Sequence, residues 1–222
     1  MAVKTDKGYK GMGMEGFIAT WYAKITGKNI DTFKKEAREI SERVLEGGAV
    51  LEVAPGPGYL AIELARLGKQ TVTGLDISKK FVEIARTKAK EGGVSVDFRN
   101  GDVAHMPFAD GMFDFIICRA AFKNFSQPVL ALDEMYRVLK PGGKASIVDL
   151  RGDVSNATID KHVTEDLHLT GFNLFFTKWI FKNSLIKRAY TTAQFKAMVA
   201  QSRFKTCEIR EEAIGVEVIL QK

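Results

Sequence analysis

Short apolar segments alternate with amphipathic segments through the middle of the chain, and this alternation limits the fold more than any other feature. The apolar segments of strand length are 49–53, 70–75, 94–99, 113–118 and 144–150. The segments with helical periodicity are 31–46, 58–68, 78–90 and 127–140. Strands and helices in this order predict a parallel sheet with helices on both faces.

Residues at the segment ends support this division. Asp31 is the expected N-cap of the first helix, Ser78 caps the helix over 78–90, and Pro128 lies in a first turn. The apolar face of the first helix consists of Phe33, Ala37, Ile40 and Val44. A KPGG turn is expected before the strand over 144–150. The chain then closes with a helix over 191–201 and a tight antiparallel hairpin over 204–211 and 213–220.

The composition is that of one ordinary globular domain. The 222 residues are 45% hydrophobic and 27% charged, which suffices for a sizeable core. No apolar run approaches the roughly 18–20 residues that cross a bilayer, and the N-terminus lacks the apolar stretch of a secretory signal. Cys118 and Cys207 lie in apolar segments and are expected as packed, reduced thiols. We therefore expect a cytoplasmic protein.

The net charge of +6 raises nucleic acid or an anionic surface as partners. Most basic residues alternate with acids along helical segments, which is typical of a solvated face. The exception is 178–188, where four basic residues without an acid could meet an anionic acceptor, a lipid headgroup or water. No metal site is predicted, because the histidines lack metal-ligand spacing with cysteine or with one another: His105, His162 and His168.

The stretch VLEVAPGPGYL, at 50–60, forms the exit from the first strand. Ligands of an open parallel sheet bind beyond the carboxyl ends of its strands, and the two glycines let the backbone approach a ligand closely. Ala54 and Pro55 begin the turn, a second proline follows, and Glu52 ends the strand. Proline removes N–H donors and glutamate repels phosphate, so this loop suits a phosphate-free ligand with a cationic amino group. S-Adenosylmethionine is such a ligand.

The next two strands also end in acids. Asp76 lies 18 residues after Gly58 and suits a grip on ribose hydroxyls. Asp102 can accept from an adenine amino group, while Val103 packs on the ring. Both acids also have a simpler interpretation, since Asp76 could merely cap a helix and Asp102 could be a turn residue.

Four motifs, in this order, resemble the class I S-adenosylmethionine-dependent methyltransferases, in the branch that includes the ubiquinone/menaquinone biosynthesis C-methyltransferases. They are VLEVAPGPG, GLDIS, VDFRNGDVAHMPFADGMFDFIICRAAF and EMYRVLKPGGKASIVDL, which cover about 49–150. The resemblance implies an α/β fold with a Rossmann-like, mostly parallel sheet of seven strands, in the order 3-2-1-4-5-7-6 with the last strand antiparallel. It also implies S-adenosylmethionine as cofactor and S-adenosylhomocysteine as product.

The resemblance implies cofactor contacts as well, carried over position by position. The expected contacts are Glu52, Ala54, Gly56, Gly58, Asp76, Ile77, Gly101, Asp102, Val103, Arg119 and Tyr22. Ala54 departs from the usual first glycine by one methyl group, which we expect to shift affinity slightly. Arg119, at the exit of the fourth strand, fits a surface ion pair equally well.

The acceptor is less constrained than the cofactor. Where amino-directed nucleic acid methyltransferases resemble one another in an Asn/Asp-Pro-Pro-aromatic stretch, this chain reads RAAFKNF, which argues against methylation of a base nitrogen. A small-molecule acceptor is expected, and a quinone is suggested by analogy alone. No catalytic dyad is evident, and methyl transfer can proceed largely by positioning and desolvation.

Two segments are expected to cover the acceptor, an N-terminal lid and a substrate cap. Within a single domain, we expect the lid and leading helix at 1–48, the cofactor core at 49–150, the substrate cap at 151–190, and the closing helix and hairpin at 191–222. Tyr9, Trp21 and Tyr22 lie in the lid, where aromatic faces attract a sulfonium. The substrate candidates are Tyr9, Lys123, Phe172, Phe175, Phe176 and Trp179. Plain packing of both segments on the core is the competing interpretation.

Other classes of function remain open. A non-catalytic S-adenosylmethionine-binding protein or a nucleic-acid-associated protein is the first alternative, because of the positive charge. An NAD(P)-dependent oxidoreductase is disfavoured by the loop chemistry.

Overall fold

The computed structural model describes residues 8–10, 13–162, 164 and 185–222. Its strands are β1 (Ala49–Val53), β2 (Thr71–Asp76), β3 (Asp97–Asn100), β4 (Phe113–Arg119), β5 (Leu139–Leu150), β6 (Glu208–Glu211) and β7 (Gly215–Gln221). Its α-helices are α1 (Gly16–Thr26), α2 (Ile30–Glu42), α3 (Tyr59–Arg66), α4 (Lys79–Glu91), α5 (Pro128–Val138), α6 (Asn156–Lys161), α8 (Ile186–Arg188) and α9 (Thr192–Gln201). Short 3₁₀ turns are η1 (Gly27–Asn29), η2 (Val103–His105) and η3 (Phe122–Asn124).

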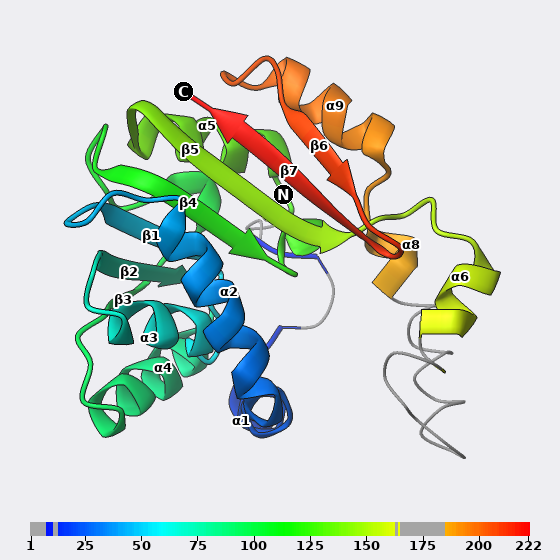
Figure 1. Ribbon diagram of the computed structural model, residues 1–222. Helices are drawn as coiled ribbons and strands as arrows, with labels where there is room; N and C mark the ends of the chain where they lie inside the picture. Colours follow the sequence, from blue (N-terminus) through cyan, green and yellow to red (C-terminus); the bar gives the residue numbers. More distant parts are fainter. Residues whose placement is uncertain (1–7, 11–12, 163, 165–184) are drawn as a thin grey trace, which may run out of the picture.

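The strands form one sheet in the order β3-β2-β1-β4-β5-β7-β6, which confirms the predicted topology (Figure 1). β1 pairs in parallel with β2 and with β4, so the chain reverses direction across the sheet after β3. β7 runs antiparallel to both of its neighbours, β5 and β6. The carboxyl ends of β1, β2, β3 and β4 therefore meet at one edge, where the strand order reverses.

Helices cover both faces of the sheet, as Figure 1 shows. On one face, α2, α3 and α4 pack over Val50 of β1 and Phe115 of β4. On the other face, α5 and α9 pack over Leu51 and Ile116, the next residues along the same strands. Successive side chains of a strand point to opposite faces, which explains why consecutive residues of these strands are apolar.

The predicted segments match most of these elements, with differences at their ends. β1 has the predicted bounds, and Ser78 caps α4 by accepting the Phe81 N–H at 3.1 Å. Asn29, not Asp31, is the N-cap residue of α2, and Asp31 instead pairs with Lys34. β3 and β6 are shorter than predicted.

The KPGG segment was expected to form a turn before β5, and this prediction was wrong. It lies inside β5, whose pairing with β4 shifts register between Phe113 and Phe115. Gly142 adopts a φ of +78°, which glycine tolerates and which lets the strand bend there without ending.

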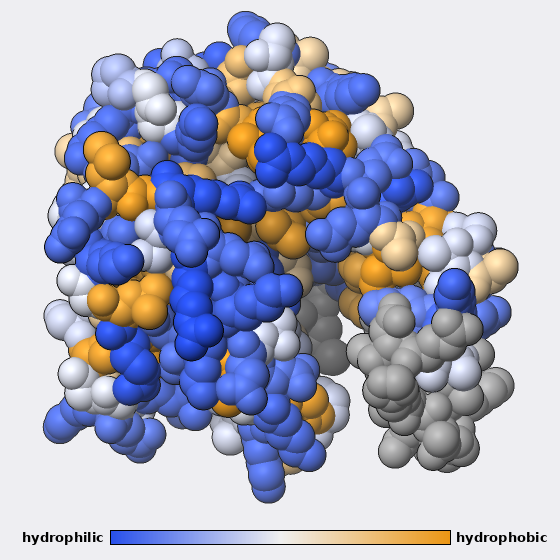
Figure 2. All heavy atoms as spheres, viewed as in Figure 1, coloured by the Kyte–Doolittle hydropathy of each residue, from blue (hydrophilic) through white to orange (hydrophobic). Residues whose placement is uncertain are grey.

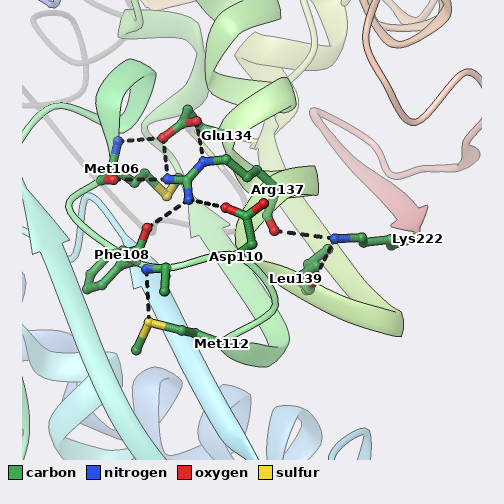
Figure 3. A network of polar contacts seen from close by, with 9 residues as sticks. Met106, Phe108, Asp110, Met112, Glu134, Arg137, Leu139 and Lys222 are labelled. Atoms are coloured by element: carbon green, nitrogen blue, oxygen red, sulfur yellow. Dashed lines mark hydrogen bonds and ion pairs between the residues drawn. The ribbon is translucent and has the colours of Figure 1, made fainter.

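An arginine on α5 anchors the loop that follows β3 (Figure 3). Arg137 Nε and Nη2 form a fork to the Glu134 carboxylate at 2.7 and 2.8 Å. Its remaining donors reach the Met106 and Phe108 carbonyls and the Asp110 carboxylate at 2.7–3.0 Å. Since Asp102 and η2 belong to the same loop, this arginine helps to position the third strand exit.

We expect Arg137→Lys to lower the free energy of unfolding by about 2 kcal/mol, because lysine keeps the charge but cannot form the fork. Urea denaturation measures the loss. The matched control is Arg210→Lys, whose ion pair with Glu208 is more than half exposed on both sides. That change should cost less than about 0.5 kcal/mol. Equal effects at the two positions would contradict the anchoring role.

The outer surface in Figure 2 is mostly polar, with hydrophobic residues exposed between the polar ones in small groups. Among the helices of the described residues, none combines the length and the apolar character that a membrane crossing requires.

Candidate functional site

A cavity of about 620 Å³ opens where the strand order reverses. Its walls come from the exits of β1, β2, β3, β4 and β5 and from residues of α1, α2 and α8. In Figure 2 the molecule is hollowed between the side that carries α1 and α2 and the side that carries α6 and α8. The cavity thus lies where ligands usually bind to an open parallel sheet.

Glu52, the acid that ends β1, lines this cavity and is only 4% exposed. Burial raises the pKa of its carboxyl group to about 8 from an ordinary 4.5, and Arg119 opposes the shift only in part. Oε2 is buried and accepts no hydrogen bond from any residue that the structure describes. A buried acceptor without a donor is costly, so Glu52 is suited to a cationic ligand group.

Asp76, at the end of β2, ties two loops together. Its Oδ2 accepts from the Gly56 N–H at 2.9 Å, and its Oδ1 accepts from the Ser78 N–H at 2.8 Å. Burial raises its pKa to about 6. Each carboxylate oxygen retains a further acceptor site, so Asp76 can hold the loops and also accept from two neighbouring hydroxyls. Asp76 is not the helix cap of the alternative interpretation, because Ser78 is the N-cap residue of α4 and Asp76 accepts from its N–H.

The loop after β1 depends on residues in the left-handed region. Gly56 has a φ of +55° and lines the cavity, and a Cβ there would make only an ordinary contact, 4.0 Å from Phe81. Gly58 has a φ of +79°, and a Cβ there would lie 2.7 Å from Phe98 and 2.8 Å from Ala85. Gly58 thus serves close packing of the helix start on the sheet, and it does not line the cavity. Ala54 takes a φ of +54° although it carries a side chain.

We expect Ala54→Gly to raise the free energy of unfolding by about 0.5–1 kcal/mol, because left-handed backbone strains alanine but not glycine. Thermal and urea denaturation measure the change. Ala197, exposed in the middle of α9, is the control, since Ala197→Gly should cost about 1 kcal/mol. A loss of stability at both positions would show that Ala54 is not strained.

The third strand exit is covered by a short N-terminal segment, residues 8–10. Tyr9 forms an antiparallel bridge with Phe125, and the Lys10 N–H donates to the Asn124 carbonyl at 2.6 Å. Gly8 packs on Asp102 so closely that a Cβ would lie 2.6 Å from its Oδ2. The other oxygen, Oδ1, accepts from the Ala104 N–H at 2.9 Å. The segment therefore lies directly against the strand exits that were expected to hold adenine.

Arg119, at the exit of β4, lies between acids of two elements. Its Nε is 2.6 Å from Glu36 Oε2 of α2, and its guanidinium stacks 5.1 Å from the ring centre of Phe33. It also lines the cavity and acts electrostatically on Glu52. The ion pair is thus present, and Arg119 also lines the cavity, so its contact with the cofactor stays a prediction.

A buried ion pair lies at the far side of the cavity. Lys123 Nζ is 2.7 Å from Asp149 Oδ1, and the side chains are 6% and 0% exposed. Nζ also donates to the Ala120 carbonyl at 2.6 Å, and the Lys123 backbone N–H donates to Asp149 Oδ2 at 2.9 Å. An ammonium group has three donors, so one remains for a ligand in the cavity that Lys123 lines. The next residue, Asn124, has a buried Oδ1 without a partner among the described residues.

The structure brings nearly all the predicted site residues to this one cavity. Those that line it are Tyr9, Tyr22, Glu52, Ala54, Gly56, Asp76, Ile77, Gly101, Asp102, Val103, Arg119 and Lys123. Trp21 is 55% exposed and does not line the cavity, contrary to its expected place beside Tyr22. The predicted cap residues lie outside the described part of the chain: Phe172, Phe175, Phe176 and Trp179.

Sequence reasoning missed several contributors. Phe33 was placed on a core-facing helix surface, yet it lines the cavity, stacked 5.6 Å from the ring of Tyr59. Asp149 was not singled out, although an acid at the end of an apolar strand was a usable signal. Leu185 and Arg188 also line the cavity; Arg188 belongs to the basic run at 178–188, whereas no sequence signal points to Leu185.

Comparisons with known proteins agree with this geometry. Residues 51–147 match a family model described as a methyltransferase domain. A demethylmenaquinone methyltransferase of Deinococcus radiodurans is 32% identical over 150 residues, which cover 66% of this chain and 62% of that protein. A ubiquinone/menaquinone biosynthesis C-methyltransferase of Bdellovibrio bacteriovorus is 39% identical over 104 residues, 46% of this chain and 44% of that protein. The chain thus spans about half to three fifths of the length of these relatives.

A solved structure has the same fold over nearly the whole chain. It is a protein of Methanococcus maripaludis described as an S-adenosyl-L-methionine-dependent methyltransferase, with a TM-score of 0.74 and 21% identity. The match covers 96% of this chain and 95% of that one. The fold, the strand exits and the matched core thus agree with the class I S-adenosylmethionine-dependent methyltransferases that the sequence motifs resemble.

Proposed function

We propose that this protein transfers the methyl group of S-adenosylmethionine to a small acceptor that combines an apolar ring with an ionisable oxygen. The observation that carries the proposal is the Glu52 carboxylate oxygen, buried without a partner among the described residues, in the same cavity as Asp76 and Asp102. Three acids at three strand exits fit a ligand with one ammonium group, neighbouring hydroxyls and an amino-substituted ring.

The β1 and β2 exits would hold the polar parts of the cofactor. Glu52 accepts from the ammonium group, and Arg119 is placed to balance the carboxylate of the same amino acid part. Asp76 accepts from the ribose hydroxyls through the oxygen sites that the Gly56 and Ser78 N–H groups leave open. Ile77, Asp102 and Val103 enclose adenine. When bound, the cofactor supplies a methyl group made electrophilic by the positive sulfur.

The acceptor would lie beside Lys123, Asn124 and Tyr9. The free donor of Lys123 can bind an oxygen atom of the acceptor and favour its deprotonated form, since opposite charge stabilises an anion at a buried position. Asn124 Oδ1 can accept from a neighbouring hydroxyl group. Phe125 and Leu150 supply apolar wall. A negative charge delocalised over an aromatic ring strengthens the ring carbon or oxygen as a nucleophile toward the methyl group.

A hydroxylated quinone or its reduced form fits this description. The Deinococcus and Bdellovibrio relatives are named for quinone methylation, and they support this choice of acceptor class. A cytoplasmic location is part of the proposal, supported by the free thiols of Cys118 and Cys207.

Methyl transfer is tested with labelled S-adenosylmethionine and three acceptors: a reduced hydroxylated naphthoquinone, a simple phenol and a short RNA. We expect S-adenosylhomocysteine and a labelled product with the first, less with the second and none with the RNA. S-Adenosylhomocysteine should also raise the melting temperature, whereas NAD should not. Stabilisation by NAD alone, or labelling of RNA alone, would refute the proposal.

A further inference from the structure

The outer surface of α1 carries a row of large hydrophobic side chains. Phe17, Trp21 and Ile25 recur every four residues and are 81%, 55% and 43% exposed. The opposite side of the helix, with Ala19 and Ala23, is buried against the molecule. No described residue covers the row, and contiguous exposed apolar surface of this kind usually has a partner.

Two lysines lie near the C-terminal end of this row. α1 contains no acidic residue, Lys24 lies one turn from Trp21, and Lys28 follows in η1. Neither lysine forms an ion pair with any residue in the described part of the chain. The nearest acids along the sequence are otherwise engaged, because Glu15 accepts from the Lys80 N–H and Asp31 pairs with Lys34.

We propose that α1 docks on the surface of an anionic lipid bilayer. A helix that turns phenylalanine, tryptophan and isoleucine outward beside lysines has the character of helices that lie in the bilayer interface. Lysines there are attracted by negative headgroups. A polypeptide partner would need acidic and apolar groups in matching positions, whereas an anionic bilayer presents both everywhere.

Docking by α1 would place the cavity entrance at the lipid surface. Tyr22 and Thr26, on the neighbouring side of the same helix, line the cavity. An apolar acceptor dissolved in the bilayer could then enter without crossing water. The exposed row and the lysines alone support the docking surface, so this proposal does not depend on the identity of the acceptor.

The first experiment uses Trp21 as its own probe. The chain contains two tryptophans, so Trp179→Phe leaves Trp21 alone. Vesicles of phosphatidylcholine with phosphatidylglycerol should shift its emission to shorter wavelength and protect it from a soluble quencher, and pure phosphatidylcholine should bind about ten-fold more weakly. Trp21 already shielded from quencher in the absence of vesicles, by another part of this chain or by a second copy, would overturn the proposal.

The second experiment compares two double variants by vesicle sedimentation. Phe17→Ser/Trp21→Ser should weaken binding at least about ten-fold. The control, Leu45→Ser/Leu130→Ser, removes side chains that are 87% and 44% exposed elsewhere and should change binding less than about two-fold. Stabilisation by S-adenosylhomocysteine, measured for both, reports folding and cofactor binding separately from docking. Equal vesicle binding by the two variants would overturn the proposal.

Discussion

Glu52→Gln is expected to weaken binding of S-adenosylhomocysteine by about 10–100-fold, because a charge-assisted hydrogen bond to a buried carboxylate becomes a neutral one. Glutamine preserves the shape of the side chain, so the cavity should remain intact. Isothermal titration calorimetry measures the affinity. Unchanged affinity in this variant would mean that Glu52 does not hold the ammonium group.

The same variant should change the pH dependence of binding. The pKa of Glu52 is about 8 in the ligand-free protein, so the side chain is mostly protonated near pH 7. A bound ammonium group lowers this pKa, so binding releases a proton and affinity rises with pH up to about 8. Titrations in buffers of different ionisation enthalpy should show close to one proton released per ligand for the wild type. Glu52→Gln should release almost none.

The free energy of unfolding should change with pH in the opposite direction to ligand affinity, which provides a check. Glu52 and Asp76 both have pKa values raised by burial in the folded protein, to about 8 and about 6. The folded state therefore binds protons more tightly than the unfolded state, and the free energy of unfolding falls as pH rises through this window. Glu52→Gln should remove the part of this fall between about pH 6 and 8. A wild-type protein that gains stability over the same range would contradict the assignment.

Lys123→Met is expected to lower the free energy of unfolding by about 3–5 kcal/mol, because Asp149 would remain as an unpaired buried charge. Urea denaturation measures the loss. The companion variant Lys123→Met/Asp149→Asn should recover all but about 1–2 kcal/mol, since it removes the buried charge and the amide oxygen of asparagine can still accept from one of the backbone N–H groups of residues 123 and 150. Failure of the second change to restore stability would show that the ion pair is not the source of the loss.

The restored double variant also separates the structural role of Lys123 from its proposed role toward the acceptor. We expect its turnover to fall at least about ten-fold while its affinity for S-adenosylhomocysteine stays the same. The rate should recover partly at higher pH, where the acceptor ionises without help. A double variant with wild-type turnover would leave Lys123 a purely structural residue.

Local patterns predicted the elements of the cofactor core well and some of their ends poorly. β1 and the Ser78 cap follow from an apolar run and from one hydroxyl group, both of which are local signals. The KPGG segment failed because a proline and two glycines normally end a strand, whereas here pairing with β4 stops at Leu139 and resumes at Lys144 in a shifted register. Strand pairing joins residues that are distant in the sequence, so a short stretch of sequence does not reveal it.

Acids at three strand exits were predictable because parallel strands bring their carboxyl ends to one edge. The protonation and the hydrogen bonds of those acids were not predictable. The raised pKa of Glu52 depends on its burial in the folded protein, and the second role of Asp76 depends on the Gly56 N–H reaching it from another loop. Gly58 shows the same limit, since its packing against Phe98 became visible only with β3 in place.

The sequence by itself determined the order of strands and helices and the chemical type of residue at each strand exit, because periodicity, capping and turn chemistry act within a few residues. Only the tertiary structure decided that Lys123 meets Asp149, that Arg119 meets Glu36, and that Trp21 faces outward while Tyr22 faces the cavity. Such contacts join residues distant in sequence, or depend on which side of a helix is buried, and packing alone selects them.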